Sequence, residues 1–278
     1  MNELQRIEFD LLRQFAAVCE KLNLRYYLVC GSALGAVKYS GFIPWDDDVD
    51  VAMPRQDYER FLREAPGYLP EGLFLQNYRT DPAFPQIFTK LRSNGTTYIE
   101  KTSAHLPIHH GIYIDIFPLD GYPPGKRDQY WLEFRKRIFL HMLTTAYTEP
   151  PLLRQKIEYR IKRALGLHKC TAQIAAAYEK MVSQWPCDGS EVWCNHGNWQ
   201  GRRDYSHREI FGEGTATCFE GLTVNVPVQA DVYLRRKYGD YTQDPPKEEQ
   251  LGHHYYTVLD CSHPYTDYVN STVKEMRK

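Results

Sequence analysis

The fold of this chain is organised around YLVCGSALGAVKYSGFIPWDDDVDVAM at residues 27–53. An apolar run at residues 26–30 predicts a strand. Gly31 and Ser32 follow it, and small residues at 33–37 predict the start of a helix. The free backbone amides at a helix start favour an anion. Gly31 would let a phosphate approach the backbone and Ser32 could donate its hydroxyl, although a plain turn is the alternative interpretation.

The second half of this stretch, residues 45–53, is predicted to form a strand with acid on one face. Side chains alternate across a strand, so Asp48 and Asp50 should point one way while Val49 and Val51 enter a core. Two carboxylates this close repel each other, and the pKa of one is raised unless a cation neutralises the pair.

Mg²⁺ fits such a pair, because it binds one or two carboxylates and fills its remaining positions with water and substrate phosphates. We therefore predict that Asp48 and Asp50 hold Mg²⁺, with Mn²⁺ as the alternative metal. Asp46 has the same strand parity and is a reserve ligand, whereas Asp47 points away. A solvated acidic turn is the alternative interpretation.

Further strands are predicted at residues 73–77 and 86–92. Lys90 and Arg92 lie two positions apart, so they share one face of the second of these strands. They either line a solvated strand edge or neutralise a diphosphate beside the acidic centre.

Another strand is predicted at residues 111–117, GIYIDIF, in which Asp115 is the one charged residue. A charge in an apolar strand needs a partner or a metal, and pairing with a nearby Lys or Arg is the simpler possibility. The prolines and glycines of residues 118–125 are predicted to break the chain after it.

Two motifs carry a resemblance to a known family, namely GSALGAVKYSGFIPWDDDVDV and the later YIDIFPLDG. The chain resembles the LicD family, which includes the fukutin-related proteins, within the nucleotidyltransferase-fold superfamily. The resemblance extends more loosely through FEG, YGDY and the Pro-Pro that follows. The chain departs from the family at Tyr39, where a basic residue is more common.

The resemblance implies an α+β fold, with a nucleotidyltransferase-like mixed sheet flanked by helices and a helical insertion. It also implies that Asp115 completes the metal site or accepts the proton of the attacking hydroxyl, so that Asp48, Asp50 and Asp115 are the catalytic residues. The predicted substrate-binding residues are Gly31, Ser32, Lys38, Trp45, Lys90 and Arg92.

Residues 1–278 are predicted to form one domain, with the helical insertion at about 126–182. Residues 126–147 and 152–169 carry apolar residues among many lysines and arginines. Their positive face could touch an anionic membrane or a phosphorylated glycan, and a solvated face is the alternative. The pair His253 and His254 is interpreted as part of a surface loop, with a role near the acceptor as the alternative.

The composition is that of an ordinary globular protein, with 42% hydrophobic and 25% charged residues. A net charge of −1 gives no general attraction to nucleic acid. No apolar stretch approaches the roughly 18 residues of a membrane-spanning helix, and the charged N-terminus lacks a signal-peptide core. Seven scattered cysteines predict reduced thiols. We expect a cytoplasmic protein, or one peripheral on the inner face of a membrane.

The resemblance also supplies the expected reaction. It implies metal-dependent transfer of a phospho-alcohol, phosphocholine first, from a CDP-linked donor to a sugar hydroxyl of a surface glycan such as lipopolysaccharide or teichoic acid, releasing CMP. Trp45 would form one wall for the choline ammonium, or else anchor its loop in the core. The alternatives are transfer of ribitol or glycerol phosphate, a nucleotidyltransferase that releases pyrophosphate, and a non-catalytic binding module.

Overall fold

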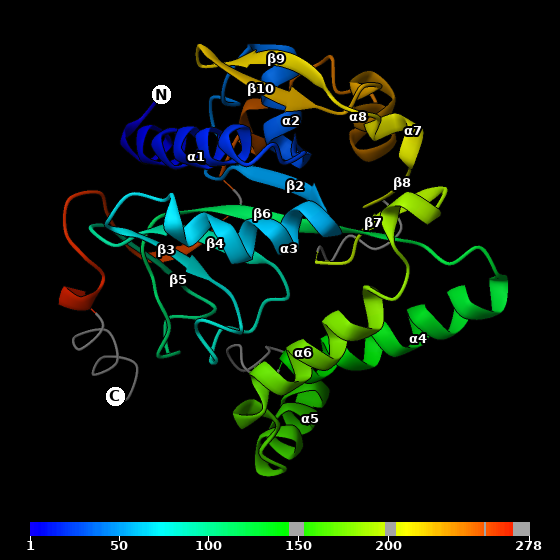
Figure 1. The fold of residues 1–278 in the computed structure, drawn as a ribbon. Coiled ribbons are helices and arrows are strands. Elements are labelled where there is room, and N and C mark those ends of the chain that lie inside the picture. Colours follow the sequence, from blue (N-terminus) through cyan, green and yellow to red (C-terminus); the bar gives the residue numbers. More distant parts are fainter. Residues whose placement is uncertain (145–152, 198–203, 253, 269–278) are drawn as a thin grey trace.

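A mixed β-sheet runs through the centre of the computed structural model, which describes residues 1–144, 153–197, 204–252 and 254–268 (Figure 1). Seven strands form this sheet, in the order β1-β2-β6-β4-β3, and β7 and β8 extend it from the far end of β6. The predicted α+β class is confirmed. Two small antiparallel pairs, β9–β10 and β5–β11, complete the β structure of the described residues.

In chain order, the helices are α1 (Glu3–Lys21), α2 (Cys30–Tyr39), α3 (Arg55–Glu64), α4 (Lys126–Leu143), α5 (Leu153–Ala164), α6 (Thr171–Val182), α7 (Arg208–Phe211) and α8 (Ala230–Tyr238). The strands are β1 (Tyr27–Leu28), β2 (Asp50–Pro54), β3 (Leu73–Gln76), β4 (Thr89–Ser93), β5 (Thr97–Glu100), β6 (Tyr113–Gly121), β7 (Val192–Asn195), β8 (Tyr205–His207), β9 (Thr215–Phe219), β10 (Leu222–Val226) and β11 (Tyr256–Asp260).

The first motif folds as predicted in outline but with shifted boundaries. α2 already begins at Cys30, a residue predicted to lie in the strand, and Cys30 has a positive φ of 52°. This left-handed residue turns the chain sharply, so the short strand β1 runs straight into the helix. β2 begins only at Asp50, so Asp48 precedes the strand instead of lying within it.

Strand β6 is longer than predicted and continues through Pro118 to Gly121. The Asp115 N–H donates to the Val49 carbonyl on the β2 side. By strand alternation, the nitrogen of Pro118 therefore faces the other edge of β6. On that edge β6 pairs with β4 as far as Ile116 and then with β7 from Leu119 onward. The proline falls in this gap, where its missing N–H costs no ladder bond, so the predicted break does not occur at Pro118 but only after Gly121, at residues 122–125.

The core lies on one face of the sheet, where the alternating apolar residues point. Val49, Val51, Ile114 and Ile116 are all completely buried. α1 and α3 cover this face, in contact with β2, β4 and β6 (Figure 1). The valine alternation in the first motif therefore does what its period predicts, which leaves the acidic residues for the opposite face.

The helical segment predicted at about residues 126–182 contains α4, α5 and α6, which extend away from the sheet (Figure 1). α4 and α6 pack through a hydrophobic cluster of their own, centred on Leu132, Tyr178 and Met181. Residues 145–152 of the predicted helices lie outside the described part of the chain. No helix among the residues searched is both long and apolar enough to cross a bilayer. The single-domain assignment remains a prediction.

Candidate active site

Three charged side chains meet where strands β2, β6 and β4 lie side by side. In the parallel pair β2–β6, Asp50 lies directly opposite Asp115. In the antiparallel pair β6–β4, Asp115 lies directly opposite Lys90. Directly opposed residues on neighbouring strands point to the same face, so this register places all three side chains in one row. The row lies on the face opposite the buried valines and isoleucines.

Lys90 is the cation of this row. Its ammonium lies 2.8 Å from Asp115 Oδ1, and only 4% of its side chain is exposed. The Nζ atom also lies 3.2 Å from the centroid of the Tyr113 ring. The carboxylate and the aromatic face together fix the position of this buried ammonium within the row.

The row forms part of the floor of a cleft of about 620 Å³. Seven of the predicted site residues line this cleft, namely Gly31, Trp45, Asp46, Asp48, Asp50, Lys90 and Asp115. Residues from several segments of the chain therefore converge on one face of the central strands. Five carboxylates line the cleft, from the four aspartates and Glu100, together with one lysine and one histidine.

This excess of acid shows in the pKa values. Burial, together with Asp48 and Asp47, raises the pKa of Asp46 to about 8. Burial also raises the pKa of Asp50 well above its usual range, and the carboxylates of Asp48 and Asp115 add to the effect. Burial raises the pKa values of Asp48 and Asp115 as well. The charge of His254 opposes the shift at Asp48, and the charge of Lys90 opposes it at Asp115. The cleft therefore holds more carboxylate than its own cations neutralise.

The donor set fits a hard divalent cation. Carboxylate oxygens that are buried, close together and under-neutralised are the ligands that Mg²⁺ takes. Asp46, Asp48 and Asp50 supply such oxygens from one short segment. In the searched part of the chain, however, the group whose ligand atoms lie within 4.8 Å of one another is Asp47, Asp48 and His254. The predicted trio of Asp48, Asp50 and Asp115 lines one cleft but is not gathered at that spacing.

Gly31 and Ser32 support the acidic residues from the start of α2. A Cβ atom on Gly31 would lie 2.7 Å from Asp46 Oδ2, so any larger residue would force this carboxylate to shift. The Ser32 hydroxyl oxygen accepts a 2.8 Å hydrogen bond from the Asp50 N–H. Ser32 is almost fully buried and does not line the cleft. Its hydroxyl fixes the first residue of β2, a contact that the sequence did not predict.

His254 joins the site from the other end of the chain. Its backbone N–H donates to Asp47 Oδ2 at 3.0 Å, and its ring Nδ1 lies 3.2 Å from Asp47 Oδ1. Its Nε2 lies 3.9 Å from Asp48 Oδ2. Burial opposes the charge of His254, but Asp47 and Asp48 raise its pKa to about 10. His254 lies in a loop, as predicted, but its side chain lines the cleft, while His253 lies outside the described residues.

Glu100 is a second member of the site that the sequence pattern did not reveal. It lines the cleft from β5, and the Tyr113 hydroxyl donates to it at 3.3 Å. Burial opposes its ionisation, but the cations Lys90, Arg92 and His254 hold the pKa of Glu100 below its usual value. The signal in the sequence was weak, because one glutamate at the end of the TTYIE run is ordinary. Tyr238, at the end of α8, also lines the cleft.

Two predicted substrate-binding residues lie away from the cleft. The Lys38 ammonium contacts Asp244 at 2.6 Å and the Tyr241 carbonyl at 3.0 Å, so it ties α2 to the YGDY segment. Arg92 is fully buried, and its guanidinium donates to Gln76 and to the Gly111 carbonyl. In these positions both side chains hold parts of the chain together. Trp45, in contrast, lines the cleft directly.

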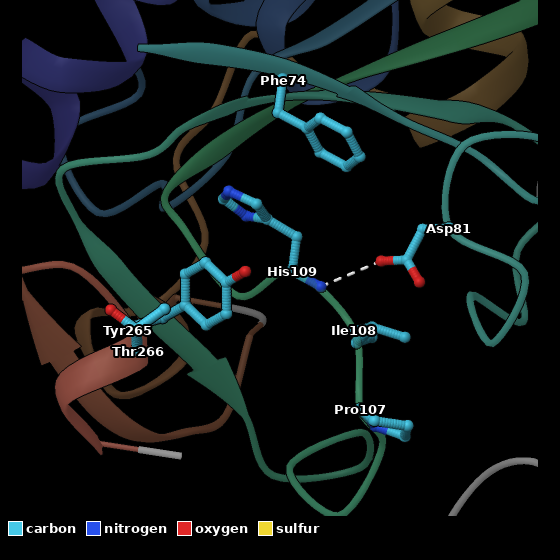
Figure 2. Close-up of a pocket in the computed structure, with 7 residues that line it drawn as sticks. All are labelled: Phe74, Asp81, Pro107, Ile108, His109, Tyr265 and Thr266. Atoms are coloured by element: carbon cyan, nitrogen blue, oxygen red, sulfur yellow. Dashed lines mark hydrogen bonds between the residues drawn. The ribbon is translucent and has the colours of Figure 1, made fainter.

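A separate hollow of about 520 Å³ lies near β3, and Figure 2 shows its lining. Its one lining carboxylate, Asp81, already accepts the His109 N–H at 2.9 Å. The His109 ring is stacked against Phe74 at a centroid distance of 5.2 Å (Figure 2). Burial lowers the pKa of His109 to about 3, so its ring is neutral. This hollow lacks the acid cluster, and we place the active site in the larger cleft.

The fold and this cleft define an α+β protein with a carboxylate-rich centre where three strands meet. The family model "LicD/FKTN/FKRP, nucleotidyltransferase domain" matches residues 23–140, which contain Asp46 to Asp50, Lys90 and Asp115. Residues 23–140 therefore match the LicD family model, in the part of the chain where the sequence motifs had indicated it.

The relatives extend this similarity along the chain. The lipopolysaccharide cholinephosphotransferase LicD of Haemophilus influenzae is 29% identical over 266 residues, which cover 91% of this chain and 96% of that protein. Two uncharacterized proteins match shorter parts. One, from Rickettsia typhi, is 32% identical over 64 residues, and one from Rickettsia prowazekii is 35% identical over 49 residues. These cover 23% and 18% of this chain, and 21% and 18% of the two relatives.

Proposed function

We propose that this chain transfers a phospho-alcohol, phosphocholine first, from a CDP-linked donor to a sugar hydroxyl of a surface glycan, and releases CMP. The observation that carries the proposal is the row formed by Asp50, Asp115 and Lys90 beside Asp48 in one cleft. The similarity to a lipopolysaccharide cholinephosphotransferase over nearly the whole of both chains supports a transferase with a glycan acceptor.

The reaction we propose is a displacement at the phosphorus distal to cytidine. The sugar hydroxyl oxygen forms a bond to this phosphorus, and the bond from phosphorus to the bridging oxygen of CMP breaks. The hydroxyl proton passes to a carboxylate in the cleft, and CMP leaves with the electron pair of the broken bond. The residues of the chain must therefore bind phosphate, receive a proton and orient the hydroxyl.

We assign these tasks from position. The Lys90 ammonium, fixed by Asp115 and the Tyr113 ring, is placed to contact a phosphate oxygen that enters the cleft. Asp48 and Asp50, with Asp46 in reserve, would hold Mg²⁺ or Mn²⁺, which supplies charge neutralisation for the phosphate oxygens when bound. Asp115 serves either as a third ligand or as the proton acceptor. Replacing a proton acceptor would leave the metal affinity unchanged, which separates the two roles.

The choline group needs an aromatic wall rather than a charge partner alone, because a quaternary ammonium has no proton to donate. Trp45 lines the cleft next to Asp46 and is our candidate for this wall. Its ring also contacts Tyr39 edge-on at a centroid distance of 6.3 Å, which fixes its orientation. An Arg or Lys at position 39 could not supply the same ring contact.

We further propose that the reaction takes place at the inner face of a membrane. A nucleotide-linked donor and a lipid-anchored glycan acceptor would meet there. No disulfide joins cysteines within the described part of the chain, and the thiols of Cys170 and Cys218 are exposed, which agrees with a reducing compartment.

The test is a CMP-release assay with the purified chain and Mg²⁺, run separately with CDP-choline, CDP-ethanolamine, CDP-ribitol and CDP-glycerol, each with and without a crude glycan extract. CMP release from one donor that stops on chelation would support the transfer and name the alcohol. Release of pyrophosphate from a nucleoside triphosphate, with no CMP from any of the four donors, would instead establish a nucleotidyltransferase.

A further inference from the structure

The helices α4, α5 and α6 form a helical arm, and α4 and α5 carry unusually many exposed apolar residues for a surface. On α4 the exposed apolar residues are Tyr130, Trp131, Phe134 and Ile138, each 47 to 65% exposed. The three aromatic rings contact one another, with centroid distances from 5.6 to 6.5 Å. Soluble surfaces rarely gather so many large apolar groups, and such a patch usually marks a binding surface.

The second helix of the arm continues this pattern. On α5 and the residue after it, Ile157, Ile161 and Leu165 are each at least 55% exposed. They lie four residues apart, so they form one stripe along the helix. We call these seven residues of α4 and α5 the α4–α5 surface. Helices α4 and α5, which carry it, extend away from the sheet in the part of the molecule that Figure 1 shows at the bottom and lower right.

The α4 stripe lies opposite the buried face of its own helix. Leu132 and Leu143 pack into the cluster shared with α6. At 100° per residue, Phe134 and Ile138 point about 120° to 180° away from these two leucines. The apolar residues of the outward stripe are therefore not part of the core. About half or more of each of their side chains is exposed.

The two stripes come together at the contact between the helices. The His141 ring contacts the Glu158 carboxylate, and the Lys162 ammonium donates to the His141 carbonyl at 3.1 Å. His141 lies one turn beyond Ile138 on α4, and Ile161 lies one turn beyond Glu158 on α5. The contact thus places the α5 stripe beside the C-terminal end of the α4 stripe.

Basic residues flank the apolar stripe on both sides. By helical position, Arg135 lies on one flank of the α4 stripe, and Lys126 and Arg137 lie on the other. All three are exposed. Residues 126–169 contain 11 Lys or Arg against four Asp or Glu, although the whole chain has a net charge of −1. An apolar stripe with long cations on its flanks matches an anionic lipid surface, because the apolar groups enter the headgroup boundary while the cations reach the lipid phosphates.

We propose that the α4–α5 surface docks the chain onto a bilayer that contains anionic lipids. This proposal names the surface by which the chain would reach the membrane, and it rests on the proposed function for its biological purpose. The binding itself can be measured without the reaction. The charge of the arm argues against a second copy as the occupant, since a symmetric contact would bring two sets of cations together. The exposed aliphatic residues argue against nucleic acid, which offers them no apolar phase.

The test uses sedimentation with vesicles of phosphatidylcholine alone or with about 30% phosphatidylglycerol, without donor or acceptor. We expect the whole chain to bind the anionic vesicles, to bind pure phosphatidylcholine at least about tenfold more weakly, and to lose affinity as salt is raised. Trp131→Ser combined with Phe134→Ser should weaken binding roughly tenfold or more, because two large rings no longer enter the interface. Arg135→Ser with Arg137→Ser should weaken it roughly tenfold as well.

Matched controls come from elsewhere on the surface. Tyr68→Ser removes an exposed ring, and Arg60→Ser with Arg63→Ser removes two exposed cations from α3. All variants should keep the wild-type melting temperature, and the control variants should keep vesicle affinity within about twofold. Unchanged vesicle binding in the Trp131 and Phe134 double variant would overturn the proposal. So would a wild-type dimer that this double variant dissociates, or tighter binding to nucleic acid than to vesicles.

The outcome is separable from the fate of the proposed reaction. Asp50→Asn removes a proposed metal ligand but lies far from α4 and α5 in the sequence and on the sheet, so this variant should bind vesicles as the wild type does. If the wild-type chain binds vesicles but releases no CMP from any donor, the reaction fails and the docking surface stands. If CMP is released but no vesicle binds, the docking surface fails and the reaction stands.

Discussion

Two clusters of charged residues flank the central sheet, and they handle their charge in opposite ways. In the cleft, five carboxylates face one lysine and one histidine, and the pKa values of four aspartates are raised. In the second cluster, Arg55 at the start of α3 binds Asp120 of β6 and Glu179 of α6. There, each of the carboxylates is paired with an arginine.

The geometry of the second cluster is that of a structural tie. Arg55 Nε and Nη2 donate to the two oxygens of Asp120 at 2.8 and 2.7 Å, a bidentate pair. Arg55 Nη1 donates to Glu179 at 2.8 Å, and Arg79 joins Glu179 to Glu59. The arginines outweigh the effect of burial and hold the pKa of Glu59 below its usual value. This cluster fastens the helical arm to the sheet and needs nothing from outside the chain.

The difference between the two clusters separates buried charges that stabilise the fold from those that serve the proposed function. A cluster in which every carboxylate is paired with an arginine stabilises the fold, whereas a cluster with carboxylates that no cation of the chain contacts costs stability and persists only where a cation or substrate completes it. The same chemical substitution, aspartate to asparagine, should therefore have opposite effects in the two places.

The largest expected effect is on activity in the cleft. Asp50→Asn should lower CMP release by about a thousandfold or more, roughly 4 kcal/mol, because a proposed metal ligand is lost. The fold should be as stable as before or more stable, since one of several repelling carboxylates is gone. The measurement is CMP release at saturating Mg²⁺, with the melting temperature recorded on the same sample. Near-normal turnover would remove Asp50 from the site.

The next effect is on stability in the second cluster. Asp120→Asn leaves Arg55 buried without its bidentate partner, so it should lower the free energy of unfolding by about 3–5 kcal/mol. The side chain of Asp120 is fully buried, which leaves no water to take its place. Denaturant unfolding of Asp120→Asn and Asp50→Asn, side by side, is the measurement. Equal stability of the two variants would show that the two clusters do not differ in kind.

The sequence carried enough information to find the acidic centre but not to assemble it. The period-two alternation of valine and aspartate correctly predicted which side chains are buried in the core. The pairing of Asp50 with Asp115, and of Asp115 with Lys90, depends on strand register between segments far apart in the chain. Register is set by the packing of the whole sheet, so no local pattern predicts it.

Other features were missed for related reasons. His254 reaches the cleft because β11 pairs with β5 and leads the residues before it back to Asp47. Nothing near His254 in the sequence indicates that contact. Pro118 was interpreted as a chain break. It lies where β6 changes its partner from β4 to β7, and the sequence of β6 alone does not show this change. Lys38 and Arg92 have the charge expected of phosphate contacts, but burial and ion pairing place them elsewhere.

A smaller effect should appear in the pH dependence of stability. The pKa of Asp46 is about 8 in the folded chain and near 4 when unfolded, so the folded state holds an extra proton between these pH values. Stability from this group is present below about pH 4 and is lost as pH rises through 8. In chelator, the free energy of unfolding should be about 2 kcal/mol lower at pH 8.5 than at pH 6, roughly 4–8 °C in melting temperature.

Mg²⁺ and one variant serve as the controls for this effect. At pH 8.5, added Mg²⁺ should raise the melting temperature, because the ionised cleft then has a cation to bind. Asp46→Asn should reduce the difference between pH 6 and pH 8.5, whereas Asp120→Asn in the Arg55 cluster should keep it. A melting temperature that does not respond to pH, chelator or Mg²⁺ would mean that the surplus acid is neutralised in another way.

The smallest expected effect concerns the hydroxyl that connects α2 to the acidic strand. Ser32→Ala leaves the buried Asp50 N–H without its 2.8 Å acceptor, which should cost about 1 kcal/mol of stability. Because that bond fixes the first residue of β2, CMP release should fall about tenfold while the donor KM changes little. Ser183→Ala, at the end of α6, is the matched control and should change neither quantity. If Ser32 instead bound the phosphate directly, the KM for the donor would rise with the fall in rate, and the hydroxyl would belong to the substrate rather than to the strand.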